Sequence, residues 1–331
     1  MAGVNRICIS HRGRRLEVPS VEMDGRTLII TGRLIRLVKV LDEEFAVSGP
    51  PLVPPAVRQR LIEAGSMADI VTFSQRPGDS EPKYPYHFEW DNAAVACAAD
   101  YEAWWNGLPQ ESRKNVRRAA RRGVTVDVAA FGDDLVRGIK SLYDETPLRQ
   151  GRRFWHYGKP VDTVRAENSS YLNRSEFIAA YHEGTLIGFM KFVYAGNLAV
   201  IMQILASPAH QDKRPMNAMI AKAMEACHRE GASHLVYGKF RYGNKGEDAV
   251  TEFKRRNGFV EARFPRYFVP LTARGRVALA LRLHRGPLGL LPAGAIEMLL
   301  KARAAALRPL TRLRNVPSAP GAVAPDRSDV M

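Results

Sequence analysis

Residues 248–259 read DAVTEFKRRNGF, and their pattern predicts a helix over 248–256 that is followed directly by Gly258 and Phe259. The apolar and aromatic run over 259–271 predicts one or two strands that close a domain. Just upstream, residues 233–238 predict another strand. The sequence strand, helix, strand indicates a domain in which helices and strands share one core.

The elements predicted further upstream continue this pattern of helices and strands. Two apolar runs meet at Glu183 and Gly184, a polar dipeptide with a glycine that suits a tight turn, so they predict a hairpin. The predicted elements are, in order, a strand over 124–131, a helix over 133–145, a hairpin of 176–182 and 185–194, a strand over 198–206, a helix over 217–229 and a strand over 233–238. We therefore predict an α+β domain over residues 124–272.

The flanking regions are predicted to form separate units. An N-terminal lobe is expected over residues 1–123, basic amphipathic helices over 273–316 and a disordered tail over 317–331. The N-terminal lobe is predicted to contain β-structure over 26–40, a helix over 56–64, strands over 68–74 and 86–98, and a helical stretch over 100–122 that is interrupted by Pro109.

Composition is that of a water-soluble globular protein rather than a disordered or membrane-spanning one. Of 331 residues, 46% are hydrophobic and 25% are charged, and the longest apolar stretches are too short to cross a bilayer. Polar and basic residues stand where a signal peptide would place its apolar segment. The three cysteines are widely spaced, which predicts neither disulfides nor a zinc knuckle and suits the cytoplasm.

The net charge of +15 is concentrated in two segments. Residues 274–314 carry nine Lys or Arg against the single acid Glu297, and residues 113–122 carry six basic residues and no acid. A surplus confined in this way predicts anionic partners at particular places on the molecule, such as phosphates, nucleic acid or a lipid surface.

The order of elements from residue 130 to 272 resembles the GNAT acyltransferase fold. The segment 248–259 is similar to the late helix of that family, with matches at Ala249, Phe253, Gly258 and Phe259. Residues 205–224 stand where the family places its acyl-CoA loop and helix. The resemblance implies an N-acyltransferase with a mixed, mostly antiparallel central sheet, and an acyl donor as co-substrate rather than a tightly bound cofactor.

A second segment, residues 104–126 with the sequence WWNGLPQESRKNVRRAARRGVTV, resembles the Fem-type peptidoglycan aminoacyltransferases. Those proteins have two GNAT-like halves, and their second half often lacks the glycine-rich loop of the GNAT family. This resemblance implies two GNAT-like lobes here, the first of them degenerate. It also implies an acyl donor that is an acyl-CoA, an acyl carrier protein or an aminoacyl-tRNA.

The predicted donor site lacks the glycines through which GNAT proteins bind the pyrophosphate of coenzyme A. This chain has no glycine between Gly196 and Gly231, and offers Lys213, Arg214 and Asn217 at the equivalent loop. Side-chain cations at the start of a helix can also bind an anion. Two further donor-binding residues are predicted: Gln203, on the strand over 198–206, to bind the acyl carbonyl, and Lys239, in the loop after the strand over 233–238, to bind donor phosphates or an oxyanion.

The basic helix predicted over 113–122 has five cations on one face, at spacings of three and four residues. We predict that this face binds an anion, and the residues are Lys114, Arg117, Arg118, Arg121 and Arg122. A solvated face paired with carboxylates elsewhere is the alternative. No aromatic residues are interleaved on the face, so base recognition is not expected.

The loop over 149–159 concentrates polar, cationic and aromatic residues, and the resemblance implies that it lines the acceptor cleft. The predicted acceptor-binding residues are Arg149, Gln150, Arg153, Trp155, Tyr157 and Lys159. His156 is the candidate general base, because a neutral imidazole accepts a proton near neutral pH. Glu145 is the alternative base, and Tyr242 is the candidate general acid, at a position where many family members have a tyrosine. An aromatic plug without chemistry is the structural alternative for this loop. No metal site is predicted, because His182, His210 and His228 show no ligand spacing.

Taken together, the residues predict an enzyme that transfers an acyl or aminoacyl group to an amine, or less readily to a hydroxyl. Direct attack in a ternary complex is expected, because no Cys or Ser has an activating context. Family analogy points to an acceptor of envelope glycan or lipid synthesis, either small or lipid-linked. The segment 274–314 predicts contact with an anionic membrane at its cytoplasmic face, or packing on the domain. The competing hypotheses are a nucleic-acid-binding protein that uses the helix 113–122 for tRNA or DNA, and a catalytically silent GNAT-like module at a membrane.

Overall fold

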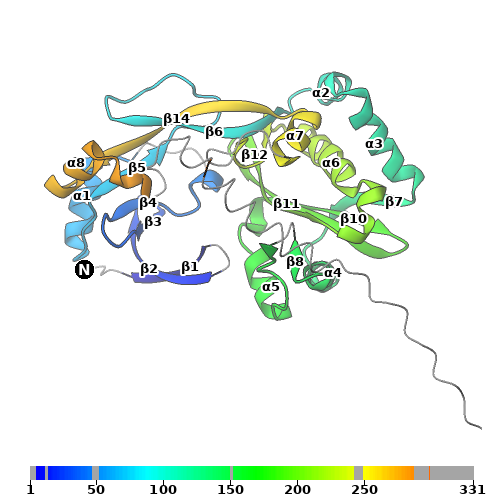
Figure 1. The fold of residues 1–331 in the computed structure, drawn as a ribbon, viewed down its shortest axis with the longest axis horizontal. Helices are drawn as coiled ribbons and strands as arrows, with labels where there is room; N and C mark the ends of the chain where they lie inside the picture. Colours follow the sequence, from blue (N-terminus) through cyan, green and yellow to red (C-terminus); the bar gives the residue numbers. More distant parts are fainter. Residues whose placement is uncertain are drawn as a thin grey trace, which may run out of the picture. The chain divides into compact units, whose positions relative to one another are not determined.

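The computed structural model describes residues 5–11, 14–46, 52–149, 152–241, 249–286 and 298. Residues 1–284 form one compact unit, and residues 285–331 form a second. Among the described residues, no helix has the length and apolar character that would be needed to span a bilayer. All the architecture below belongs to the first unit, whose described elements lie along one large sheet (Figure 1).

Twelve strands form this sheet, in the order β1-β2-β3-β4-β5-β14-β6-β13-β12-β11-β10-β7. Only the pairs β4–β5 and β12–β13 are parallel within the described chain, so the sheet is mixed and mostly antiparallel, as predicted. The strands are β1 Asn5–His11, β2 Arg14–Met23, β3 Arg26–Thr31, β4 Leu37–Val40, β5 Ile70–Ser74, β6 Phe88–Cys97, β7 Val124–Ala129, β10 Ser175–His182, β11 Thr185–Ala195, β12 Leu198–Ala206, β13 His234–Val236 and β14 Val260–Pro270.

Helices occupy the connections between these strands. A short separate hairpin of β8, Leu148–Arg149, and β9, Arg152–Arg153, follows α4. The α-helices are α1 Pro54–Glu63, α2 Tyr101–Gly107, α3 Gln110–Arg121, α4 Asp133–Asp144, α5 Val161–Asn168, α6 Pro215–Arg229, α7 Ala249–Arg256 and α8 Ala273–Ala280. The 3-10 turns are η1 Glu43–Phe45, η2 Leu172–Arg174, η3 Pro208–Lys213 and η4 Leu283–Arg285.

The sheet contains the same run of elements twice. β2, β3, β4, α1 and β5 follow one another in the first half, and β10, β11, β12, α6 and β13 follow one another in the second. In each half a helix returns the chain so that the next strand runs parallel to the last one. The final strands are exchanged: β6 pairs with β13, β14 pairs with β5, and β6 also pairs with β14. The two halves are thus joined through backbone hydrogen bonds.

The second half has a separate core on each face of its sheet. Along β10, Ile178 and Ala180 pack into the core that contains α6, whereas Phe177 and Ala179 pack into the core that contains α4. Side chains alternate between the faces of a strand, so one strand supplies both cores. Helix α6 is strongly buried because its apolar residues recur at helical spacing, and Pro215 suits its first turn.

Most predicted elements are confirmed, and one helix was not predicted. The β-structure predicted over 26–40 comprises two strands, β3 and β4, separated at Gly32, whose φ of +92° takes the chain out of the extended region. Helix α5 was not predicted, because its sequence VDTVRAEN lies among the polar and aromatic residues of a connection. Residues 259–271 form the one strand β14. Of the C-terminal helices predicted over 273–316, α8 is observed, and nearly all of the remaining segment lies outside the described residues.

Gly258, which ends α7, provides a test of how α7 and α2 pack together. Its φ is +81°, and a Cβ there would lie 2.5 Å from Trp104 Nε1. Gly258→Ala should lower the free energy of unfolding by about 3 kcal/mol, because left-handed strain and a clash add together. Gly231→Ala is the matched control, since Gly231 has φ +72° and no neighbour within 4 Å. Urea unfolding that shows equal losses for the two variants would contradict the packing of Trp104 described here.

Candidate active site

The site is built around an irregularity in strand β12. Its register with β11 shifts between Lys191 and Phe192, so Met202 has no paired residue and forms a β-bulge. β12 pairs with β13 only over its first three residues, Leu198–Val200. Beyond them the two strands share no ladder, and a cavity of about 1300 Å³ is lined by residues of both. The cavity thus lies where the sheet stops being continuous.

The loop predicted to line the acceptor cleft does line this cavity. Arg149, Arg153, Trp155, His156 and Lys159 all contribute to the wall, together with Gln203 and Lys239 from the sheet side. The first of these, Arg149, fixes the loop: its two terminal nitrogens donate to Ala206 O at 2.9 Å and Leu142 O at 3.0 Å. Burial lowers the pKa of this guanidinium.

His156 is held beside an ion pair. Lys159 Nζ donates to both carboxylate oxygens of Glu167 at 2.7 Å, and lies 3.2 Å from His156 Nδ1. Glu167 Oε2 lies 3.7 Å from the same ring nitrogen. Burial acts to raise the pKa of Glu167, but its hydrogen bonds to His156 and Lys159 outweigh burial, and the pKa falls below its usual value. Nδ1 of His156 therefore faces both a donor, Lys159, and an acceptor, Glu167.

Tyr143 connects His156 to the bulged strand. Its ring lies 4.4 Å from the imidazole ring of His156, and its hydroxyl accepts a hydrogen bond from Gln203 Nε2 at 2.7 Å. Burial raises the pKa of this phenol to about 12, so the hydroxyl stays neutral. Tyr143 is fully buried and is not among the residues that line the cavity, whereas Gln203 is, so Tyr143 holds the amide of Gln203 from behind the cavity wall.

The opposite wall of the cavity carries an ion network. Arg266 bridges Glu43 at 3.0 Å and Asp91 at 3.1 Å, and Lys239 reaches the other oxygen of Asp91 at 2.9 Å. Burial acts to raise the pKa of Asp91, but Lys239 and Arg266 outweigh burial, so that its pKa falls. Lys239 was predicted to bind the donor; its charge is shared with Asp91.

The predicted donor residues at the start of α6 lie apart from this cavity lining. Arg214 has φ +60° and precedes the first turn of α6, where the N–H groups of a helix are available to an anion. Asn217 is buried and donates to Asn257 Oδ1 at 2.9 Å, so its side chain has a structural contact. Lys213 lies 3.9 Å from Asp212.

The basic helix predicted over 113–122 corresponds to α3, and its last turn reaches the same place. Arg122 pairs with Asp212 at 2.8 Å, which brings the end of α3 next to Lys213 and Arg214. Earlier on the helix, Arg117 lies over the Trp105 ring at 5.8 Å, and Arg118 reaches Glu111 at 3.6 Å. Several cations of the predicted face are therefore paired, and the C-terminal end of α3 adjoins the start of α6.

The remaining predicted residues fall elsewhere. Glu145 is not among the residues that line the cavity and lies 3.9 Å from Arg149, and Tyr157 is also absent from the lining and is exposed. Gln150 and Tyr242 lie outside the described residues. Sequence reasoning missed Glu167 and Tyr143. Glu167 lies in α5, the helix that was not predicted. Tyr143 has the helical spacing of a core residue, so its position in the sequence does not distinguish it. The one indication of a polar partner at this place was Gln203, a polar residue on a strand that is otherwise apolar.

Lys191 on β11 is paired with Gln203 on β12, and we expect its titration to make the free energy of unfolding depend on pH. It is fully buried, donates to Asn168 O at 2.7 Å and Ser170 O at 2.5 Å, and burial lowers its pKa from 10.5 to about 8. Between pH 8 and pH 10.5 the unfolded chain binds more protons at Lys191 than the folded chain does, so the free energy of unfolding should rise with pH. The rise in the free energy of unfolding should be about 3 kcal/mol larger than in Lys191→Met, because each unit of pKa shift corresponds to about 1.4 kcal/mol. Urea unfolding of both proteins from about pH 7 to pH 10.5 measures it, and parallel curves would contradict it.

Known proteins share this arrangement of elements. The structure is similar to FemX, with a TM-score of 0.50 and 12% identity over 84% of this chain and 90% of that one. It is also similar to the C-terminal domain of a protein described as a lysylphosphatidylglycerol synthetase from Agrobacterium fabrum, with a TM-score of 0.52 and 16% identity over 81% and 88%. No curated protein sequence matches the chain.

These identities show a common fold, and the predicted GNAT fold is confirmed. Residues 141–259 also match the model of the Acetyltransferase (GNAT) family. That match runs from α4 to the end of α7, and includes His156, Glu167 and the bulged strand β12. The chain therefore has the GNAT fold, and residues 141–259 within it are similar to the acetyltransferases of that family.

Proposed function

We propose that this protein is an N-acyltransferase that joins an acyl or aminoacyl group to an amine inside the cavity beside β12. The observation that supports this best is the convergence of Gln203, His156 and Glu167, from a bulged strand, a loop and a helix, on one hollow. Each supplies a different group that acyl transfer needs: an amide that hydrogen-bonds a carbonyl, a proton acceptor, and a carboxylate that orients it.

In the proposed reaction the acceptor nitrogen attacks the acyl carbonyl directly. A C–N bond forms, the bond from the carbonyl carbon to the donor's sulfur or oxygen breaks, and the proton released by the amine passes to His156 Nε2. This role requires the tautomer with the proton on Nδ1. Glu167 Oε2, 3.7 Å from Nδ1, can accept that proton, and Lys159 Nζ, which lies 3.2 Å from Nδ1, then donates to Glu167 instead of to the ring. The leaving thiolate or alkoxide takes up a proton, and Tyr242 remains our candidate for its source.

The acyl donor is proposed to bind through its phosphates at the start of α6. GNAT-family enzymes use acyl-CoA, which fits the family match. Here Lys213, Arg214 and Arg122 supply side-chain cations close to the first turn of α6, where family members use glycines. A thioester of coenzyme A or of a carrier protein, or an aminoacyl-tRNA, would each present phosphates to these cations.

The acceptor is proposed to carry an anionic group as well as its amine. Eight Lys or Arg line the cavity against five Asp or Glu. Two of these cations, Arg76 and Arg149, donate to backbone carbonyls rather than to carboxylates, and the ion-pair partner of Arg149, Glu145, lies as far away as 3.9 Å. Acceptors of envelope glycan or lipid synthesis have this character, and the fold shared with FemX and the lysylphosphatidylglycerol synthetase domain supports that class.

The purified chain should transfer an isotopically labelled acyl group to an amine, and mass spectrometry of the products measures this. Donors to be tested are acyl-CoA, an acylated carrier protein and aminoacyl-tRNA, each with amino sugars, amino acids and aminoacyl or amino lipids. We expect one donor class to yield a product whose mass has increased by the labelled acyl group. Failure of every donor class to give a product, with a folded chain, would contradict the proposal.

We also propose that the protein contacts an anionic membrane through α8 and the basic segment that follows it. Val277 and Leu281 are more than half exposed and are flanked by Arg274, Arg276 and Arg282, a pattern suited to a lipid surface. Changing Val277 and Leu281 together to serine should weaken sedimentation with vesicles of anionic lipid. Val260→Ser, at another exposed valine, is the control. Equal sedimentation of both variants would contradict this role for α8.

A further inference from the structure

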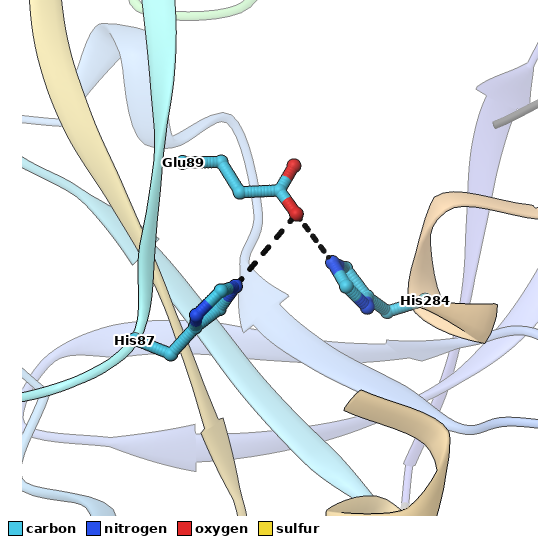
Figure 2. A group of neighbouring side chains, drawn as sticks. All are labelled: His87, Glu89 and His284. Carbon is cyan, nitrogen blue, oxygen red and sulfur yellow. Dashed lines mark hydrogen bonds and ion pairs between the residues drawn. The ribbon is translucent and has the colours of Figure 1, made fainter. Parts of the chain in front are cut away.

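Two histidines and a glutamate lie close together at the N-terminal end of strand β6. His87 precedes the strand and Glu89 lies two residues further along the chain, so alternation places both side chains on the same side. His284 comes from η4, 195 residues away from Glu89 in the sequence. Figure 2 shows the three side chains pointing toward one another, with both imidazole rings directed at the carboxylate of Glu89.

The distances between these groups suit a shared ion. His284 Nε2 lies 2.7 Å and His87 Nε2 lies 3.8 Å from Glu89 Oε1, and one ligand atom from each residue lies within 4.8 Å of the others. Two ligands of a tetrahedral zinc ion, each at about 2.0–2.1 Å from the metal, are about 3.3 Å apart. Two of the three separations fall on either side of this value and the third is at most 4.8 Å, so side-chain shifts of about one ångström would complete the geometry.

The surroundings hold one ligand firmly and leave one side open. The side chain of His284 is 1% exposed, with its ring 4.6 Å from the ring of Phe268. Its Nε2 is the nitrogen that faces Glu89, and its Nδ1 is buried without a hydrogen-bond partner among the described residues. The side chain of His87, by contrast, is half exposed, so solvent reaches the cluster from that side.

We propose that His87, Glu89 and His284 bind a zinc ion, with water in the fourth position. Two imidazoles and one carboxylate form a donor set that zinc accepts, whereas Mg²⁺ prefers oxygen ligands. The ion would fasten η4, at the end of the first compact unit, to β6 in the centre of the sheet. Sequence spacing could not indicate this site, since only the fold brings His284 to the other two residues. The site is independent of the transfer chemistry proposed above.

Cobalt(II) and zinc titrations of the full chain test the site, with the protein free of any polyhistidine tag and treated with chelator. We expect one equivalent of Co²⁺ to bind with the intense visible absorption of a tetrahedral ion, and one equivalent of Zn²⁺ to displace it. Zinc should also raise the Tm of the chain, because an ion that binds only the folded state stabilises it. Mg²⁺ should do neither.

Variants assign the binding to these residues. His87→Ala and Glu89→Gln should each weaken Co²⁺ binding at least about tenfold, comparable to losses seen on disturbing metal sites. His234→Gln is the control. A ring nitrogen of His234, on β13, contacts the neighbouring Ser233, and His234 is not part of the cluster. Because His87 is exposed, its variant keeps the test valid even where a change at buried His284 prevents folding. Absence of Co²⁺ binding, or equal binding by His87→Ala and His234→Gln, would overturn the proposal.

Discussion

Replacing His156 with alanine should reduce kcat for acyl transfer by about 10²- to 10⁴-fold, the usual contribution of a general base. The imidazole is removed from beside Glu167 and Lys159, and no other histidine lines the cavity in the part of the chain that the structure describes. The fold should be retained, because the ring is packed only against the partly exposed loop and Tyr143. Steady-state kinetics with the acyl donor that yields product measures the effect.

The control for this change is His210→Ala. His210 lies in η3, contacts Ser207 and is not among the residues that line the cavity. It should keep its rate within about threefold of the unmodified chain, in line with a surface change. Glu167→Gln adds a second measurement: loss of the carboxylate should shift the pH–rate profile as well as lower kcat. Full activity of folded His156→Ala would remove this residue from the mechanism.

Changing Gln203 to leucine should lower kcat/KM by about 10²-fold, as expected for the loss of a hydrogen-bond donor to the carbonyl oxygen. Leucine has a similar volume but cannot hydrogen-bond the acyl carbonyl or the hydroxyl of Tyr143. Tyr143→Phe removes only the partner that holds the amide, and should cost less. The double variant should then be no slower than Gln203→Leu alone, since both changes act through one group.

Gln59→Leu is the matched control for Gln203, because Gln59 lies on exposed α1 and contacts only Glu63 among the described interactions. It should leave kcat/KM unchanged. Additive losses from Gln203→Leu and Tyr143→Phe would show that the two side chains act separately, which would contradict the positioning role given to Tyr143.

Local patterns in the sequence were sufficient for much of the second half. The hairpin of β10 and β11, strand β12 and helix α6 have strong apolar periodicity, and each lies within a few residues of its predicted position. The loop at 149–159 was predicted to line a cleft because aromatic and cationic residues rarely gather for packing alone, and five of the predicted residues do line the cavity.

The features that were not predicted depend on contacts between distant residues. The exchange of β6 and β14 between the two halves joins segments about 170 residues apart, and such pairing leaves no local signal. Glu167 was missed with its helix α5, and the bulge at Met202 follows from the register of β12 against β11. These same features open the cavity and arrange its residues, so the site could be predicted by residue type but not by geometry.

The central claim is that acyl transfer takes place in the cavity beside β12. A crystal structure of the chain with the acylated product from its own reaction tests this most directly. We expect electron density for the new amide within reach of Gln203 and His156, with the acceptor extending toward Arg149. Product bound away from these residues, along α3 or on the first half of the sheet, would contradict the account.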